Sequence, residues 1–117
     1  VAAANARYKL IYFDARGVVE TVRVMFYLKR VPYIDFRFPV CCQTFARPEY
    51  DKVAEDGVML KCNMNRVPVL QVLGQERTCV GQSKAIERFV AGQHGFMGST
   101  PLEAAQIDMI CEHVRDI

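Results

Sequence analysis

The chain has 117 residues, about half of them apolar, which is enough for one globular domain with a modest core. Its 15 basic and 13 acidic residues are well mixed and give a formal charge of +2, so no basic cluster indicates a nucleic-acid partner or an anionic membrane surface. The apolar stretches fall far short of the roughly 20 residues that a membrane span needs, and we expect a soluble protein without a membrane partner.

The first third of the chain predicts a strand, a helix and a second strand. Residues 9–13 form a short apolar run, residues 14–17 a turn, residues 18–29 a helix, and residues 33–38 an alternating strand after Pro32 has ended the helix. The expected buried face of the helix carries its apolar residues: Val18, Val22, Met25, Phe26 and Leu28. The expected solvent face carries its charged residues: Glu20, Arg23 and Lys29. This order predicts a right-handed βαβ unit.

The middle of the chain is less regular and then predicts a hairpin and a helix. Residues 39–65 contain a short helix at 48–53 and a polar turn at 56–57. Residues 69–73 and 77–80 form two strands joined by a tight two-residue connection, Gly74-Gln75, and a helix follows over 82–91. The order βαβ, linker, ββα predicts an α/β fold of the thioredoxin-like plan.

The last 26 residues predict a linker and a strongly specified helix. Residues 92–99 are rich in glycine, and Thr100, Pro101 and Glu103 supply a cap, a first-turn proline and the acidic residue of a capping box. The helix carries an apolar stripe that needs a partner: Ile107, Ile110, Cys111, Val114 and Ile117. We expect a thioredoxin-like domain over 1–91, a linker over 92–99, and over 100–117 the first helix of a truncated all-α domain.

The cysteines and histidines predict no metal site. The five cysteines show no CxxC spacing, and the two histidines, His94 and His113, complete no zinc pattern with them. We therefore expect reduced thiols in a cytoplasmic protein, with organelle import left open because the chain starts at Val1 rather than at Met. The adjacent pair Cys41-Cys42 is expected to be two free thiols, and a redox role is the alternative.

Two segments together predict a clamp for a ligand. A proline that enters an apolar strand at Val67-Pro68-Val69 is tolerated at the start or edge of a sheet, and it leaves Val67 with free backbone N–H and C=O groups to offer a peptide. Gln82 and Ser83 open a helix, where unpaired N–H groups and the helix dipole favour a carboxylate. The pair of segments suits a small acidic peptide.

These segments, in this order, resemble the glutathione S-transferase family, most closely its Sigma-like class. Residues 8–17 resemble the opening strand and active-site turn, Val67-Pro68 the cis-proline, and residues 82–89 the motif for the glutathione carboxylate. Residues 100–117 are similar to the start of the family's helical domain. The resemblance covers nearly the whole chain.

The resemblance implies a catalytic role for a tyrosine at the end of the first strand. Tyr12 would donate its hydroxyl hydrogen to the sulfur of glutathione and so favour the thiolate that attacks a small hydrophobic electrophile. Arg16 would place a cation near the ring of Tyr12 and the thiolate. The residues alone favour an ordinary strand aromatic at Tyr12 and a solvated turn residue at Arg16, and the complete motif favours the catalytic roles. No cysteine ends the first strand, so we expect no thiol–disulfide exchange there.

The resemblance also assigns contacts to glutathione, the expected co-substrate. Gln82 and Ser83 would bind the γ-glutamyl carboxylate. Val67 would pair its backbone with the cysteinyl unit, exposed by Pro68 in the cis form.

Three further contacts are implied, of which the first two depart from the family pattern and the third matches it. Arg47 stands where Sigma-like enzymes usually carry a tryptophan and would meet the glycyl carboxylate, and Lys52 lies one place from an expected lysine. Asp116 would reach the glutathione amine across a homodimer interface, and a solvated helix residue is the alternative.

The function implied is a glutathione transferase that conjugates or isomerises a small electrophile. The alternative is a non-catalytic binding or scaffolding module that kept the fold. The replaced tryptophan and a loop at 56–66, which is about three residues longer than the common form, motivate this alternative. The sequence does not identify the electrophile.

Overall fold

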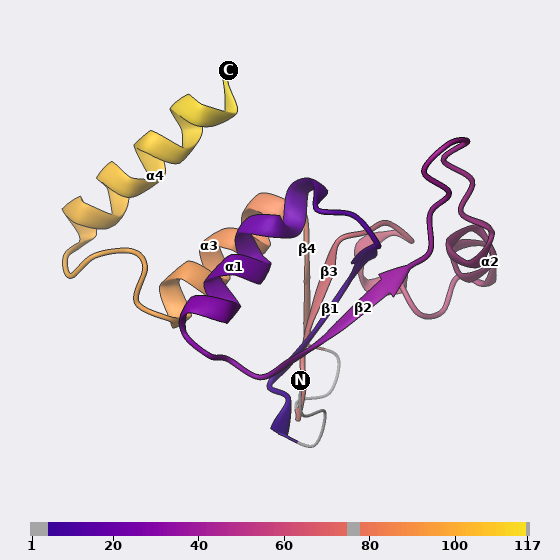
Figure 1. Cartoon of the computed structure of the whole chain (residues 1–117). Coiled ribbons are helices and arrows are strands. Elements are labelled where there is room, and N and C mark those ends of the chain that lie inside the picture. The colour runs from indigo at the N-terminus through magenta and orange to yellow at the C-terminus, as the bar shows by residue number, and fades with distance from the viewer. Residues whose placement is uncertain (1–4, 75–77, 117) are drawn as a thin grey trace.

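The computed structural model describes residues 5–74 and 78–116 and contains a four-stranded mixed sheet with four helices (Figure 1). The strands lie in the order β2-β1-β3-β4. Their bounds are Tyr8–Phe13 for β1, Tyr33–Phe38 for β2, Val69–Val72 for β3 and Cys79–Gly81 for β4. The helices are α1 (Glu20–Leu28), α2 (Pro48–Asp56), α3 (Ser83–Gln93) and α4 (Pro101–Arg115), with short 3₁₀ turns η2 (Gly17–Val19) and η3 (Lys61–Asn63). This arrangement is the predicted thioredoxin-like α/β fold.

The predicted βαβ unit is confirmed, because β1 and β2 pair in parallel with α1 between them. The expected faces of α1 are partly wrong. Val18 and Leu28 are 50% and 62% exposed, whereas Val19 is fully buried. Arg23, expected on the solvent side, is only 6% exposed. The helix opens with the η2 turn, whose tighter winding turns Val19 rather than Val18 toward the sheet. Arg23 is buried because its guanidinium finds carbonyl acceptors in the turn after β1.

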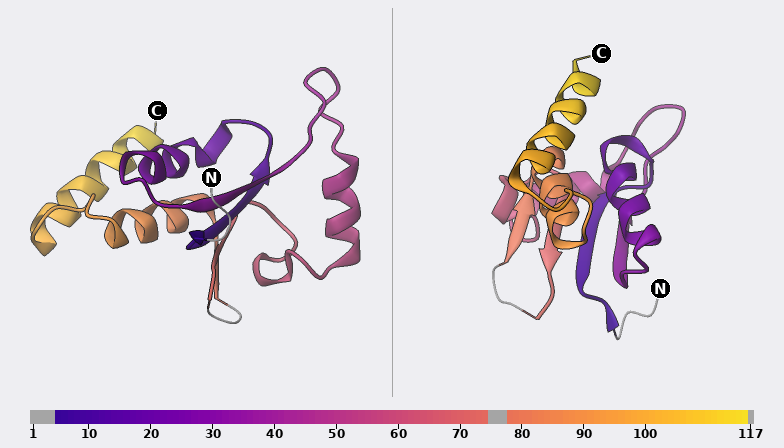
Figure 2. Two further views of the ribbon diagram at one scale, coloured as in Figure 1. Left: turned by 60° about the horizontal axis from the view of Figure 1, so that its bottom comes forward. Right: turned by 90° about the vertical axis from the view of Figure 1, so that its left-hand side faces the viewer.

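Helices cover both faces of the sheet, with α1 and α3 on one face and α2 on the other (Figure 2). The core under α1 and α3 includes Tyr8, Leu10, Val22, Phe26, Leu70, Ile86 and Val90. The core on the other face is formed by Ile11, Phe38, Leu60 and Val69. Because side chains alternate along a strand, Tyr12 packs against the first core and Phe13 against the second.

The middle of the chain follows the prediction with two differences. Helix α2 extends to Asp56, past the predicted end at residue 53, and stops where Gly57 takes a left-handed conformation with φ of 73°. The hairpin of β3 and β4 forms, but its predicted two-residue connection is wrong. The strands end at Val72 and begin again at Cys79, and the Val72 N–H still donates to the Thr78 carbonyl at 3.0 Å. The predicted turn residue Gln75 and strand residue Arg77 lie outside the described residues.

The predicted cap of α4 is confirmed in a modified form. The Glu103 N–H donates to Thr100 Oγ1 at 3.1 Å, while the Glu103 carboxylate accepts from the Ser99 N–H at 2.6 Å rather than from the N–H of Thr100 itself. Arg88 of α3 binds α4 through Asp108, at 2.8 Å between Nε and Oδ1, and through Glu112.

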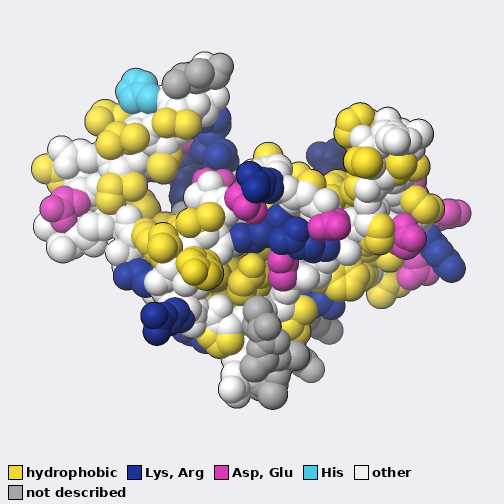
Figure 3. Space-filling model, viewed as in Figure 1, with side chains coloured by type: hydrophobic (Ala, Val, Ile, Leu, Met, Phe, Trp, Pro, Cys, Tyr) yellow, Lys and Arg dark blue, Asp and Glu magenta, His cyan; other side chains and the backbone are white. Residues whose placement is uncertain are grey.

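The outer face of α4 is apolar and open, as Figure 3 shows along the helix. Of the expected stripe, Ile107 is half-buried, while Ile110, Cys111 and Val114 are exposed, and Ile117 lies outside the described residues. Within residues 5–74 and 78–116, no helix is long and apolar enough to cross a membrane.

A disulfide joins Cys62 of η3 to Cys79 of β4, which corrects the expectation that all five thiols are reduced. The two residues are 17 positions apart in the sequence and lie in elements of different type, so their spacing does not predict the pair. The fold brings η3 against the edge strand β4 and places their Cα atoms 6.7 Å apart. Cys41, Cys42 and Cys111 are free and exposed.

Candidate functional site

The sheet brings the predicted ligand residues to one of its ends. In the register of the strands, Ile11 of β1 pairs with Val69 of β3, and Val69 pairs with Gly81 of β4. Tyr12 follows Ile11, Val67-Pro68 precedes Val69, and Gln82-Ser83 follows Gly81 (Figure 1). These five residues, Tyr12, Val67, Pro68, Gln82 and Ser83, therefore lie around the same strand ends, and we call them the strand-end site.

Tyr12 is the penultimate residue of β1, and its ring is half-buried over the backbone of Gly17. A Cβ atom added at Gly17 would lie 2.5 Å from Tyr12 Oη and 3.0 Å from Cε2. Gly17 also has φ of 47°, in the left-handed region that favours glycine. Within the part of the chain that the structure describes, the Tyr12 hydroxyl has no hydrogen-bond partner, so it is free to donate to a ligand.

The cation at the ring of Tyr12 comes from α1. The guanidinium carbon of Arg23 lies 6.0 Å from the centroid of the Tyr12 ring. The side chain of Arg16 is 89% exposed, and its nearest acidic partner is Glu20, 3.9 Å from Arg16 Nε to Oε2. Sequence reasoning missed Arg23 because the helical pattern placed it on the solvent side. The signal was weak: Arg23 directly follows Val22, at the border of the apolar face.

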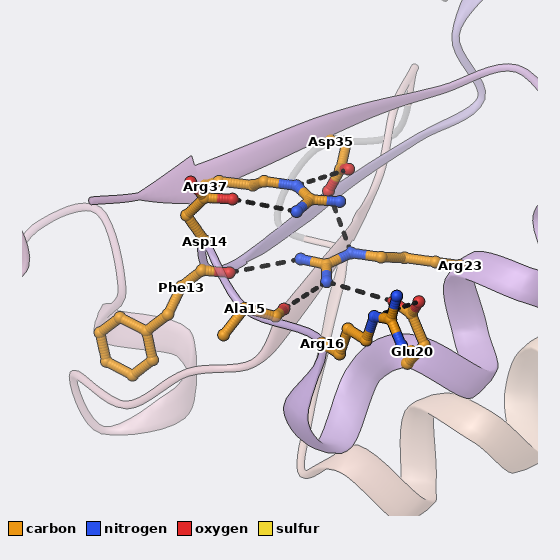
Figure 4. Close-up of polar contacts among 8 residues, drawn as sticks. All are labelled: Phe13, Asp14, Ala15, Arg16, Glu20, Arg23, Asp35 and Arg37. Atoms are coloured by element: carbon orange, nitrogen blue, oxygen red, sulfur yellow. Dashed lines mark hydrogen bonds and ion pairs between the residues drawn. The ribbon is translucent and has the colours of Figure 1, made fainter. Parts of the chain in front are cut away.

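The guanidinium of Arg23 holds the turn that follows Tyr12 (Figure 4). Its Nη1 donates to the carbonyl of Ala15 at 2.5 Å, and its Nη2 donates to the carbonyl of Phe13 at 3.3 Å. Its Nη1 also lies 3.6 Å from Glu20 Oε1, and its Nε lies 3.4 Å from Asp35 Oδ1 without hydrogen-bond geometry. One buried side chain thus joins α1, the turn and β2.

A second arginine closes the network on the solvent side. Arg37 donates from Nε to Asp35 Oδ2 at 2.9 Å and from Nη1 to Asp14 Oδ1 at 3.0 Å. These bonds, first that to Asp14 and then that to Asp35, raise the pKa of Arg37 above its ordinary value. The charges of Figure 4 balance, with three cations and three anions: Arg16, Arg23, Arg37, Asp14, Glu20 and Asp35. The buried charge of Arg23 is therefore compensated.

The peptide bond between Val67 and Pro68 is cis, as the resemblance implied. The side-chain amide of Asn63 supports the loop, since Nδ2 donates to the carbonyls of Arg66 and Pro68, each at 3.2 Å. Between these two anchored carbonyls, the backbone N–H and C=O of Val67 have no hydrogen-bond partner within residues 5–74 and 78–116. Asn63 packs on Gly81, where an added Cβ would lie 2.0 Å from Asn63 Oδ1.

Gln82 and Ser83 begin α3, and their donors are unpaired within the described part of the chain. Gln82 is the N-cap residue with φ of 70°, and its carbonyl accepts from the Ile86 N–H at 3.0 Å. The Gln82 side chain makes no capping hydrogen bond and is exposed, while Ser83 is half-buried. The first-turn N–H groups of this 11-residue helix and the positive end of its dipole are therefore directed toward the strand-end site.

Arg47 lies beside the strand-end site, on the opposite face of the sheet from Tyr12. Its guanidinium carbon lies 5.2 Å from the ring centroid of Phe13 and 4.9 Å from that of Tyr50. With Phe13, Arg47 lines a shallow depression of about 410 Å³ whose other walls are Ala15, Val40 and Phe45. The depression reaches the end of β1 from the α2 side.

The structure does not bring the other two predicted contacts to the strand-end site. Lys52 is exposed on α2 and borders a separate surface depression with Val53, Glu55 and Asp56. Asp116 is an exposed C-cap residue of α4. In the described ranges, neither Lys52 nor Asp116 has an ion pair, and no group of three or more His, Cys, Asp and Glu side chains could hold a metal ion.

The chain is similar to named proteins over nearly its whole length. Glutathione S-transferase 4 of Caenorhabditis elegans is 37% identical over 109 residues, which are 93% of this chain and 45% of the relative. Hematopoietic prostaglandin D synthase of Gallus gallus is 31% identical over 109 residues, which are 93% of this chain and 47% of the relative.

A solved structure has the same fold. The crystal structure of monomeric Na-GST-3, a glutathione S-transferase from the hookworm Necator americanus, superimposes with a TM-score of 0.75 at 35% identity, over 95% of this chain and 47% of that chain. No protein-family model matches the chain. The chain thus spans about half the length of the relatives it matches, and over that span it is similar to glutathione S-transferases in sequence and fold.

Proposed function

We propose that this chain is the glutathione-binding part of a glutathione S-transferase that activates the thiol of glutathione through Tyr12. The observation that carries the proposal is the strand-end site. A phenol hydroxyl and a backbone edge that have no partner among residues 5–74 and 78–116 surround the same strand ends as the N-terminus of a helix. The similarity to named transferases, at 37% identity for the Caenorhabditis elegans protein, supports the same activity.

Glutathione would bind across the strand ends. Its γ-glutamyl carboxylate would accept hydrogen bonds from the first-turn N–H groups of α3 and from the side chains of Gln82 and Ser83. Its cysteinyl unit would pair with the backbone of Val67 beside Pro68. This orientation leaves the thiol toward the end of β1, where Tyr12 lies.

Tyr12 would then favour the thiolate over the thiol. A hydroxyl that donates to sulfur stabilises the charged form more than the neutral one, and each unit of pKa is equivalent to about 1.4 kcal/mol. The thiolate would attack a small hydrophobic electrophile in a conjugation or an isomerisation. Arg16, exposed in the turn and 3.9 Å from Glu20, would approach the bound thiolate or the electrophile from the solvent side.

The remaining contacts belong to the same proposal. Arg47, whose guanidinium lies over the ring of Phe13, would meet the glycyl carboxylate, and Lys52 further along α2 is the second candidate. In a homodimer, Asp116 would reach the glutathione amine of the partner subunit. The open apolar stripe of α4 supports association with a helical domain or a second copy. Analytical sedimentation will test whether this protein is a dimer or a monomer like the hookworm protein.

The test is a calorimetric titration of glutathione into the protein. The Gln82→Ala, Ser83→Ala double variant is expected to lose about tenfold or more in affinity, because each charge-assisted hydrogen bond contributes about 1.5–3 kcal/mol. Tyr12→Phe is expected to keep the affinity and lose the thiolate absorbance and most of the turnover. A folded protein that binds no glutathione would refute the proposal and favour a scaffolding module. Full activity of Tyr12→Phe would refute the role of Tyr12 alone.

A further inference from the structure

Arg23 is the one charged side chain that is buried among residues 5–74 and 78–116. It lies in the middle of α1, and the reaction proposed above does not require it to touch glutathione or the electrophile. Burial of a cation costs desolvation free energy unless it is paired and hydrogen-bonded, so the contacts of Arg23 indicate a role beyond packing. Those contacts are the carbonyls on either side of Asp14, directly after Tyr12.

The turn after Tyr12 is held from two sides. The backbone N–H of Asp14 donates to the Phe38 carbonyl at 2.8 Å, and the N–H of Ala15 donates to the Phe13 carbonyl at 2.8 Å. From the other side, the fork of Arg23 binds the carbonyls of Phe13 and Ala15. The path of the chain after β1 is therefore fixed at Phe13, Asp14 and Ala15.

The same turn determines where the hydroxyl of Tyr12 lies. Gly17 follows the turn and contacts the phenol, because a Cβ atom added at Gly17 would lie only 2.5 Å from Tyr12 Oη. A displaced turn would move Gly17 and release the phenol ring from that contact. The guanidinium carbon of Arg23 also lies 6.0 Å from the centroid of the Tyr12 ring, so a positive charge lies near the phenol.

We propose that Arg23 is a positioning residue for Tyr12: by holding the carbonyls of Phe13 and Ala15 it directs the phenol O–H and so favours the thiolate of bound glutathione. The proposal rests on the proposed function for its effect on the thiol, and on the geometry alone for its effect on the turn. Lysine cannot replace this arginine, because a single ammonium cannot span both carbonyls and Asp35 as the planar fork does.

The experiment compares Arg23→Lys with Arg30→Lys. Both variants keep the charge, and Arg30 is an exposed arginine just beyond α1 and outside the network. Three quantities are measured: glutathione affinity by calorimetry, the pH titration of the ultraviolet absorbance of the bound thiolate, and hydrogen exchange at the amides of Asp14 and Ala15. In Arg23→Lys we expect affinity within about threefold of the parent, a thiolate midpoint higher by about one pH unit, and exchange faster by about tenfold or more. Arg30→Lys is expected to match the parent in all three.

Parental exchange and a parental thiolate midpoint in Arg23→Lys would overturn the proposal. If Arg23→Lys does not fold, the double variant Arg23→Gln, Asp35→Asn removes both members of the ion pair and leaves no unpaired carboxylate at Asp35. Its exchange rate and its thiolate midpoint then test the proposal in the same way. If the parent protein itself binds no glutathione, the proposed function fails, and the exchange comparison still decides whether Arg23 holds the turn. Faster exchange with an unchanged thiolate midpoint would show a structural role only and would also overturn the proposal.

Discussion

Removal of the Cys62–Cys79 disulfide is expected to lower the stability of the protein by about 3 kcal/mol. The bond closes a loop of 17 residues. In the chain-entropy model, a closed loop of this size removes about 10 cal/mol/K from the unfolded ensemble, which corresponds to about 3 kcal/mol at 25 °C. For a domain of this length, about 4 °C per kcal/mol gives a melting temperature lower by roughly 12 °C.

The assay is urea unfolding of three proteins. They are the parent, the double variant Cys62→Ser, Cys79→Ser, and the single variant Cys111→Ser as the control. Cys111 is free and exposed, so its variant should unfold with the parent. A reducing agent should bring the parent to the stability of the double variant and leave that variant unchanged. Equal stability of the parent and the double variant would refute the reasoning, since a formed disulfide must restrict the unfolded chain.

Three further predictions concern the turn, a free thiol and pH. Gly17→Ala should cost about 1–2 kcal/mol in urea unfolding and impair thiolate formation, since a methyl group there meets the Tyr12 hydroxyl in a left-handed backbone; unchanged stability would contradict this. Hydrogen bonds from the side chain and then the backbone of Thr44 lower the pKa of Cys41 to about 7, so its alkylation should be half-maximal near that pH, and a midpoint above 8 would oppose it. Burial lowers the pKa of His94 below its ordinary 6.5, so the unfolded chain binds the proton more readily. The contribution of His94 to stability should be constant above pH 6.5 and fall as the pH drops below 6.5, and the His94→Gln variant should lose this dependence. An identical pH profile for the variant would exclude the mechanism.

The parts of the site that sequence could predict are those set by local backbone chemistry. Proline before an apolar strand and glycine before a helix constrain their own neighbours, which is why the sequence predicted Val67-Pro68 at the start of β3 and Gln82-Ser83 at the start of α3. The choice of Tyr12 came from the family resemblance, and local chemistry fixed only its place near the end of the first strand. Each of these signals acts within a few residues of the chain.

The parts that sequence could not predict depend on contacts between distant elements. Arg23 is buried because the turn after β1 passes over α1, and helical periodicity carries no information about that turn. Cys62 and Cys79 meet because η3 packs against β4, and their spacing matches no motif. Lys52 lies one helical position from a residue that the resemblance expected. A shift of one position turns a side chain by about 100° around the helix axis, which is enough to move it to another face.

The strand ends also set the length of ligand that fits. From β4, which leads into α3, to β1 there are two strand spacings, or about 9.6 Å, and three extended residues span at most about 10–11 Å. A tripeptide can therefore place one terminal carboxylate at Gln82 while its middle residue passes Val67 and its thiol approaches Tyr12. We expect γ-glutamylcysteine, which keeps the carboxylate and the thiol, to bind within about tenfold of glutathione, and cysteinylglycine, which lacks the γ-glutamyl carboxylate, to bind at least about tenfold more weakly than γ-glutamylcysteine. Competition calorimetry measures both ligands. The opposite order would place the dominant anion contact at Arg47 rather than at α3, and the ligand would then run in the reverse direction across the strand ends.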